Sequence, residues 1–344
     1  MKENVLRREC FMISSYVNEF SAKYAPDYKN GLSNHLPMAQ VALFQLTNDM
    51  DSVHLWTDYY INHTDLELTG TSDLLVTYID QYLGQIEAYP AYVNFFEAWV
   101  AKSGIEVVLV EALNKLSKGL VARAFHAWIR LAYGVDSHNY DEVIKGLAYL
   151  ASSYLPVPEA SRKVALKELE TVLDQVAKNQ YFAGKPLAEG LFTDVLGAIM
   201  EDSEFDALNF QVKGDPIDLF ERMVDYAVED YLHTGSFLEL HTITALHAIA
   251  VLEPYIEDLS QVMAIYMTAY IASLLTIKDR EQDGQPDSYK LETWEDAFSY
   301  VLSSSDAHSI KLTYASYQLY RFTENDQLLK VVGLRLTQDQ TLHA

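Results

Sequence analysis

The sequence predicts an all-α fold, a large single helical domain of about fifteen helices around a central pocket, spanning residues 1–344. Apolar residues recur every three or four positions along nearly the whole chain, which is the spacing of an amphipathic helix. We find no convincing run in which apolar and polar residues alternate as in a strand. The segment Phe237–Leu252, FLELHTITALHAIAVL, is apolar on every side, which is typical of a helix buried in a core.

The helical spacing defines the elements in order, and several of them begin with residues that commonly start a helix. Asp215 followed by Pro216 is one such start, and Ser305 or Asp306 is another. Two prolines within residues 155–159 mark a candidate hinge inside the single domain. The predicted helices span residues 5–23, 36–46, 52–62, 72–83, 92–102, 104–116, 120–135, 140–154, 161–178, 188–200, 217–232, 237–252, 259–277, 290–303, 306–322 and 327–336.

The composition indicates which binding partners are unfavourable and which cellular compartment is expected. Acidic residues outnumber basic ones by 49 to 25, and the net charge of −24 argues against nucleic acid or an anionic membrane as partner. A single cysteine excludes an internal disulfide, and the N-terminus has no apolar core of a secretory signal, so we expect a cytoplasmic protein. Residues 259–277 carry no charge, but their polar side chains favour a buried helix over a membrane span.

Several cofactor motifs are missing from the sequence. No two glycines are separated by a single residue, so there is no glycine-rich dinucleotide fingerprint, and there is no phosphate-binding loop. The sequence also lacks a cysteine zinc motif, paired Glu-x-x-His motifs and a G-x-S-x-G nucleophile turn. We therefore expect no tightly bound cofactor, and flavin, kinase and serine-hydrolase functions are disfavoured.

Two histidines stand where a helix could present them to a polar pocket. Ser33 or Asn34 would cap a helix and leave His35 at its N-terminus, where the helix dipole favours a neutral imidazole that can act as a base. The alternative is an exposed cap residue. Further along, His126 and Arg130 share a helical stripe, and Arg130 could hold an anionic oxygen while His126 moves a proton. The alternative is a polar stripe facing solvent.

Two more histidines lie in similar settings. His241 and Thr244 share a stripe with small neighbours that leaves room for a ligand, whereas His247 points away and is not expected to share a metal with His241. A core histidine bonded to a carbonyl is the alternative for His241. His308 lies one turn before Lys311, which could stabilise an oxyanion or extend its amine to water.

Four segments in this order resemble the questin oxidase-like family: SNHLPMAQVALFQL, GLVARAFHAWIRLAYGVD, FLELHTITALHAIAVL and SDAHSIKLTYASY. The family includes fungal enzymes that open an anthraquinone ring by Baeyer–Villiger oxidation. The resemblance implies a monooxygenase, without a flavin-binding fold, that acts on a polycyclic phenolic ketone with dioxygen. NADPH is associated with the fungal reaction, and here it would act as a diffusible reductant of the substrate or not at all. Arg130 stands where some members are expected to have another histidine, and Ser305 replaces an expected acid.

The resemblance also implies the residues of the site, because the four histidines and Lys311 match polar positions of the family. In the expected reaction His241 or His126 removes a proton from a phenol or enol, and Arg130 and Lys311 stabilise the oxyanion. The remaining two histidines would orient the carbonyl or donate a proton. The expected catalytic residues are His35, His126, His241, His308, Lys311 and Arg130, and the expected substrate-binding residues are Asn34, Tyr133 and Thr244.

Two other functions remain open on the sequence alone. Three or four converging histidines could instead bind zinc or iron in a metal-dependent enzyme, although no metal ligands are assigned. A helical shell with a pocket rich in tyrosine and histidine could also bind an aromatic or lipid-like ligand without catalysis. All three functions require the histidines to meet in space.

Overall fold

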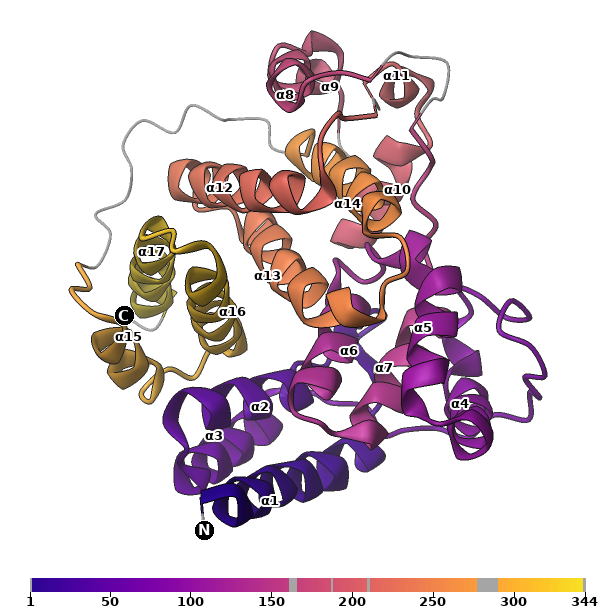
Figure 1. The fold of residues 1–344 in the computed structure, drawn as a ribbon, viewed down its shortest axis with the longest axis vertical. Coiled ribbons are helices and arrows are strands. Elements are labelled where there is room, and N and C mark those ends of the chain that lie inside the picture. The colour runs from indigo at the N-terminus through magenta and orange to yellow at the C-terminus, as the bar shows by residue number, and fades with distance from the viewer. Residues whose placement is uncertain (1, 161–165, 187, 209–210, 277–289, 343–344) are drawn as a thin grey trace.

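The computed structural model describes residues 2–160, 166–186, 188–208, 211–276 and 290–342. Helices form most of this part of the chain, and its only sheet is a two-stranded hairpin (Figure 1). The predicted all-α fold class is therefore confirmed. None of the helices in the described ranges is both long enough and apolar enough to cross a membrane.

Three helices and the hairpin form the N-terminal part of the fold, drawn in indigo in Figure 1. In the hairpin, Asp27 lies opposite Ser33 in antiparallel register. The second helix packs against both the first and the third. The bounds are α1 (Lys2–Lys23), β1 (Asp27–Tyr28), β2 (Leu32–Ser33), α2 (Leu36–Thr47) and α3 (Met50–His63).

The next group is built around the closest helix pair of the fold, α6 and α7. A Cβ atom at Gly134 would lie 2.7 Å from the backbone nitrogen of Val143, and one at Gly146 would lie 2.6 Å from Cα of Leu131. Only glycine at these two positions allows the helix backbones to approach so closely. The elements are η1 (Ile86–Ala88), α4 (Tyr89–Ser103), α5 (Ile105–Leu116), η2 (Ser117–Gly119), α6 (His126–Asp136) and α7 (Tyr140–Ser152).

The helix α13 lies at the centre of the remaining elements and contacts α6, α12, α14 and α16. Its residues 239–249 are all buried, and its bounds match the predicted Phe237–Leu252, so the expectation of a buried helix is confirmed. The bounds of these elements are α8 (Leu169–Ala177), α9 (Gln180–Gly184), α10 (Phe192–Met200), α11 (Ser203–Asp206), α12 (Pro216–Thr234), α13 (Phe237–Leu252), η3 (Glu253–Tyr255), α14 (Leu259–Leu274), α15 (Trp294–Val301), α16 (Ala307–Thr323) and α17 (Gln327–Leu342).

The predicted helix at residues 72–83 is wrong, because this segment is extended and then forms turns. Side chains take the backbone groups that a helix would use. The Gln81 side chain accepts from the N–H of Thr77. The Tyr92 hydroxyl accepts from the N–H of Tyr82 and donates to the carbonyl of Ile79. The loop is thereby tied to α4 without helical hydrogen bonds.

The predicted helix at residues 120–135 starts too early, because α6 begins only at His126. The three residues before it, Arg123, Ala124 and Phe125, have positive φ angles of 53°, 54° and 67°, which no right-handed helix contains. Arg123 therefore lies in the turn before the helix that carries His126 and Arg130.

Other helix ends differ by less. The predicted helix at 188–200 starts later, as α10, because Gly190 has a φ of 126°. The one at 290–303 starts after Thr293, which caps α15. Residues 161–165 and 277, at the ends of two predicted helices, lie outside the described residues. Within the described parts, residues 166–168 are not helical and α8 begins only at Leu169, and α14 ends at Leu274.

Candidate functional site

Four histidines from four different helices meet at one place, and we call them the histidine cluster: His35, His126, His241 and His308. His35 precedes α2, His126 begins α6, and His241 and His308 lie near the starts of α13 and α16. The centroid of the His35 ring lies 4.6 Å from that of His126 and 4.4 Å from that of His308. The His241 centroid lies 4.7 Å from His126 and 5.4 Å from His308. The four rings therefore form one close group.

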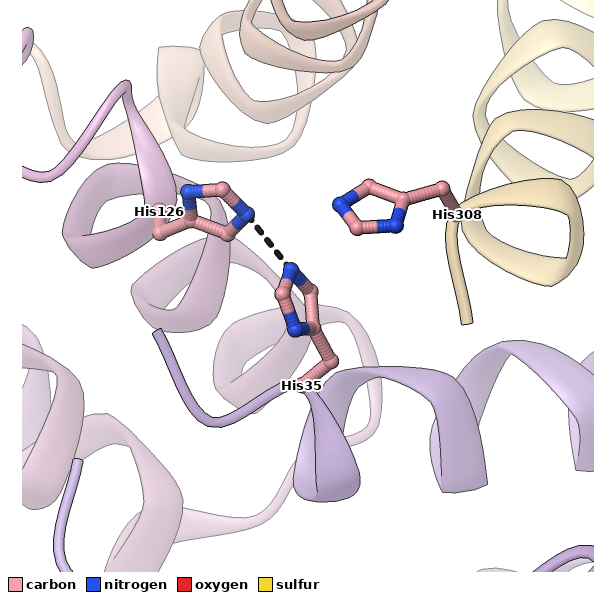
Figure 2. A group of neighbouring side chains, drawn as sticks. All are labelled: His35, His126 and His308. Carbon is pink, nitrogen blue, oxygen red and sulfur yellow. Dashed lines mark hydrogen bonds between the residues drawn. The ribbon is translucent and has the colours of Figure 1, made fainter. Parts of the chain in front are cut away.

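The turn into α2 holds His35 in place. The side chain of Asn34 accepts from the N–H of Leu36, and Pro37 fits the first turn of the helix. The backbone N–H of His35 donates to the hydroxyl of Tyr60 at 3.2 Å, and the same hydroxyl lies 3.5 Å from Nδ1 of the ring. Figure 2 shows that this ring points to His126, with 2.8 Å between the two Nε2 atoms.

In the other three rings Nδ1 faces an oxygen that can only accept. Nδ1 of His126 lies 2.6 Å from the carbonyl oxygen of Arg123, and Nδ1 of His241 lies 2.8 Å from that of Phe237. Nδ1 of His308 lies 3.4 Å from a carboxylate oxygen of Asp306. We assign the ring proton to Nδ1 in each case, because carbonyl and carboxylate oxygens have no proton to give. The Nε2 atoms of these three rings are then lone-pair donors.

Burial keeps the cluster neutral. It is the main cause that lowers the pKa of His35, His126 and His241 well below the ordinary value, and it lowers the pKa of His308 to about 4 although Asp306 opposes the shift. The positive charge of Lys311 acts in the same direction. At pH 7 the site therefore offers uncharged imidazoles.

Lys311 lies beside the cluster as a second unusual group. Its side chain is only 1% exposed, and within the described part of the chain its amine has no hydrogen-bond partner. Burial lowers the pKa of Lys311 to about 7, and Asp306 partly offsets this. Nε2 of His241 is likewise buried without a partner among the described residues. Two unsatisfied buried groups at one site are costly unless a ligand satisfies them.

Three of the histidines lie close enough together to be candidate ligands of one metal ion. His35, His126 and His308 each offer one nitrogen, and the three nitrogens lie within 4.8 Å of one another. Neutral imidazole is a common ligand for zinc, iron and copper. An Nδ1–H bonded to a carbonyl or carboxylate, as in His126 and His308, is the usual outer arrangement of a metal-binding histidine. The residues present therefore fit a divalent transition metal.

The structure places Arg130 in an ion pair instead of in the histidine cluster. Its guanidinium donates to both carboxylate oxygens of Glu142, at 3.0 and 3.2 Å, and both side chains are buried between α6 and α7. The carboxylate holds the pKa of Arg130 above its ordinary value, so the arginine stays charged. Its charge is thus already neutralised by a protein group.

The three expected substrate-binding residues also use their polar groups within the protein. Asn34 donates to the carbonyl of Ala25, Thr244 donates to the carbonyl of His241, and Tyr133 donates to the carbonyl of Lys311. These bonds support the backbone of segments that carry cluster residues. The catalytic and binding roles expected for all these side chains stay predictions.

Sequence reasoning missed two groups at the site. The ring of Phe237 lies 4.9 Å from that of His241 and 4.5 Å from that of His308, and Phe237 is 50% exposed. Its position four residues before His241 on a helix was a usable signal. Arg335 on α17 donates to Asp306 at 2.5 Å, behind His308. Nothing in the sequence links these two distant residues, although Asp306 caps α16 as predicted.

Comparison with protein-family models matches residues 32–316 to the family described as questin oxidase-like. The matched range contains all four histidines of the cluster and Lys311, and it confirms the resemblance seen in the sequence. No curated protein matches the chain at a significant level.

Proposed function

This chain belongs to the questin oxidase-like family, which marks it as an oxidoreductase, and we propose that it uses a metal ion in the histidine cluster to react an aromatic ketone with dioxygen. The substrate class is a polycyclic aromatic or phenolic ketone, and the reaction is an oxygen insertion of the Baeyer–Villiger type. The observation that carries the proposal is the set of three neutral imidazole nitrogens within 4.8 Å.

The tautomers support metal binding. Two of the three candidate ligands, His126 and His308, direct Nδ1–H to protein oxygens, so their Nε2 atoms carry the lone pairs that a metal would use. Without an ion, Nε2 of His126 accepts from Nε2–H of His35, and metal binding would replace that hydrogen bond. A family of oxidoreductases favours a redox-active ion over zinc, and imidazole suits iron. Such an ion, when bound, would supply the one-electron chemistry that ground-state dioxygen requires to react with a closed-shell molecule.

The protein's own groups would bind the substrate and handle its protons. The exposed ring of Phe237 offers an aromatic surface beside two cluster histidines, and we place the approach of the substrate there. Lys311, with a pKa of about 7, can stabilise a phenolate or enolate when protonated and can accept a proton when neutral. Tyr60 would orient His35 through its hydroxyl.

The balance of the reaction requires a reductant. Insertion of one oxygen atom of dioxygen into a C–C bond leaves the second atom to be released as water. That step consumes two electrons and two protons. NADPH and a proton from solvent would supply them, and NADPH would act from solution because the sequence has no dinucleotide fingerprint.

A second candidate uses the same residues without a metal. The unpartnered Nε2 of His241 would remove a proton from the substrate, and Lys311 would stabilise the anion that then reacts with dioxygen directly. The bare, buried Nε2 of His241 is the observation that favours this version, because a base needs a free lone pair.

Metal analysis combined with oxygen uptake separates these versions. We expect the purified protein to carry about one iron per chain, and chelation to remove both the metal and the oxygen uptake with hydroxylated anthraquinones or anthrones in the presence of NADPH. His126→Gln should lose both. His247→Gln is the matched control, because His247 is a buried histidine of α13 that contacts Tyr133 and Tyr314 instead of the cluster.

Three results would count against the metal version. Oxygen uptake by metal-free protein, lost in His241→Gln, would favour direct base catalysis. Tight binding of an aromatic molecule that is recovered unchanged after aerobic incubation would favour a non-catalytic binding protein. Equal losses of metal and oxygen uptake in His126→Gln and His247→Gln would show that the histidine cluster has no specific role in the reaction.

A further inference from the structure

We propose that a buried polar network outside the histidine cluster sets the distance between His35 and His126, and that its members are positioning residues. The network, which we call the brace, consists of Asp27, Arg123, Tyr149 and Ser33. The inference rests on the proposed function for its effect on metal binding. Its effect on the ring of His126 does not depend on a metal.

The brace begins at the turn before α6. Arg123, Ala124 and Phe125 all take the left-handed conformation, which is unfavourable for residues with a side chain. Three such residues in succession persist only where surrounding contacts hold them, and strain of this kind concentrates at functional sites. The turn aims one carbonyl at His126, since the oxygen of Arg123 accepts from both the backbone N–H and ring Nδ1 of His126, at 3.1 and 2.6 Å.

The side chain of Arg123 anchors this turn to the hairpin. Its guanidinium lies 2.8 Å from a carboxylate oxygen of Asp27, and both side chains are mostly buried. A Cβ atom at Gly31, in the hairpin turn, would lie 2.8 Å from Nη1 of Arg123. Gly31 also has a φ of 121°, so glycine serves both the turn and the seating of the arginine.

The same carboxylate reaches the segment that carries His35. The hydroxyl of Tyr149 on α7 donates to the other carboxylate oxygen of Asp27 and lies 2.8 Å from the hydroxyl of Ser33. Ser33 pairs with Asp27 in the hairpin and stands two residues before His35. One carboxylate thus connects the backbone that aims His126 with the backbone that presents His35, and the two Nε2 atoms meet at 2.8 Å.

The test compares Asp27→Asn and Tyr149→Phe with Tyr270→Phe. Tyr270 is a matched control, because it is a buried tyrosine whose hydroxyl donates to an aspartate, Asp230, away from the brace. Two properties are measured: binding of Co²⁺ with its visible spectrum, and the ring ¹⁵N chemical shifts of His126 in metal-free protein. We expect Asp27→Asn to weaken Co²⁺ binding by about 10–100-fold and to change the spectrum. Tyr149→Phe should weaken binding less, and Tyr270→Phe should match wild type.

The nitrogen shifts keep the two proposals separate. Wild type should show a proton fixed on Nδ1 of His126, and Asp27→Asn should show a mixture of tautomers, because the carbonyl of Arg123 is no longer held in place. If wild type binds no Co²⁺, the proposed metal function fails while these shifts still decide the role of the brace. If Asp27→Asn does not fold, Tyr149→Phe carries the test. Unchanged binding and unchanged shifts in folded variants would overturn the inference.

Discussion

At the scale of residues, burial decides which protons the site holds. The four cluster histidines are neutral because burial removes the water that would solvate a charged ring. In His126, His241 and His308 the Nδ1–H group donates a hydrogen bond to a protein oxygen. A neutral ring with a fixed tautomer presents a lone pair in one direction only. His126 and His308 can therefore accept a ligand as they stand, whereas His35 must first release the Nε2 proton that it donates to His126.

The ion pair of Arg130 with Glu142 gives a direct test of its role. Arg130→Met takes the bidentate partner from the buried carboxylate of Glu142, which keeps Lys145 at 3.8 Å, and should lower the free energy of unfolding by about 3–5 kcal/mol. The double variant Arg130→Met/Glu142→Met should recover most of this loss and keep its oxygen uptake, because an apolar pair can replace a buried ion pair. Urea unfolding and oxygen-uptake assays measure both effects. A double variant that is stable but inactive would show that Arg130 is required for the reaction.

The exposed ring of Phe237 leads to a prediction about substrate binding. Phe237→Ala should raise KM for a polycyclic substrate several-fold and change kcat less, because it removes contact area and leaves the histidines in place. Steady-state oxygen uptake provides both constants. Phe322→Ala is the control, since Phe322 is 54% exposed and packs against Phe220. The same rise in KM for both variants would contradict a specific role of Phe237.

At the level of the helices, the sequence predicts a helix well where its own apolar pattern determines its burial. It predicts less well where contacts between distant residues determine the backbone conformation. The segment Phe237–Leu252 is apolar all round, so its burial and bounds follow from its sequence. At residues 72–83, by contrast, the hydroxyl of Tyr92 replaces helical hydrogen bonds, and no local pattern reveals that. The turn before α6 contains no glycine, so its left-handed residues give no signal either.

The candidate site shows the same division. Each cluster histidine could be selected from its own helix, because a histidine on an apolar or capping segment is unusual. The partner of Arg130 could not, since the contact with Glu142 depends on how α6 packs against α7. The brace could not be predicted from the sequence either, because Asp27 and Arg123 meet only after the hairpin has folded over the turn.

The strained turn predicts a stabilising substitution. Ala124 has a φ of 54°, and glycine adopts this conformation without the steric cost that a Cβ atom brings. Ala124→Gly should raise the free energy of unfolding by up to about 1 kcal/mol, measured by urea unfolding. Ala122→Gly is the control, because Ala122 has no positive φ and should be destabilised by the same change. A loss of stability in Ala124→Gly would show that the turn carries no strain.

At the scale of the whole molecule, the buried basic groups make stability depend on pH. The pKa of Lys311 is about 7 in the folded protein and 10.5 ordinarily, so between these values the unfolded chain binds a proton that the folded protein does not. Stability is then lost as the pH falls from 10.5 to 7. The pKa of His308, about 4 against 6.5, causes a second loss between pH 6.5 and 4.

Thermal unfolding of metal-free protein across this range tests the effect. We expect Tm to fall as the pH is lowered from 9.5 to 7, and to fall again below pH 6.5. Lys311→Met should reduce the alkaline part of the dependence and leave the acidic part, because Lys311 titrates in the upper window; burial also lowers the pKa of Lys145, so a smaller alkaline dependence remains. A Tm that stays constant between pH 9.5 and 7 in wild type would show that Lys311 is charged in the folded protein.

The contact between His35 and His308 has a consequence for synthesis. His308 comes far later in the sequence than His35, yet their rings are in contact, so the cluster cannot be complete until the start of α16 has left the ribosome. A nascent or truncated chain that ends before α16 offers three imidazoles at most. Under the proposed function, a metal ion would find all three of its candidate ligands only after the ribosome has passed His308.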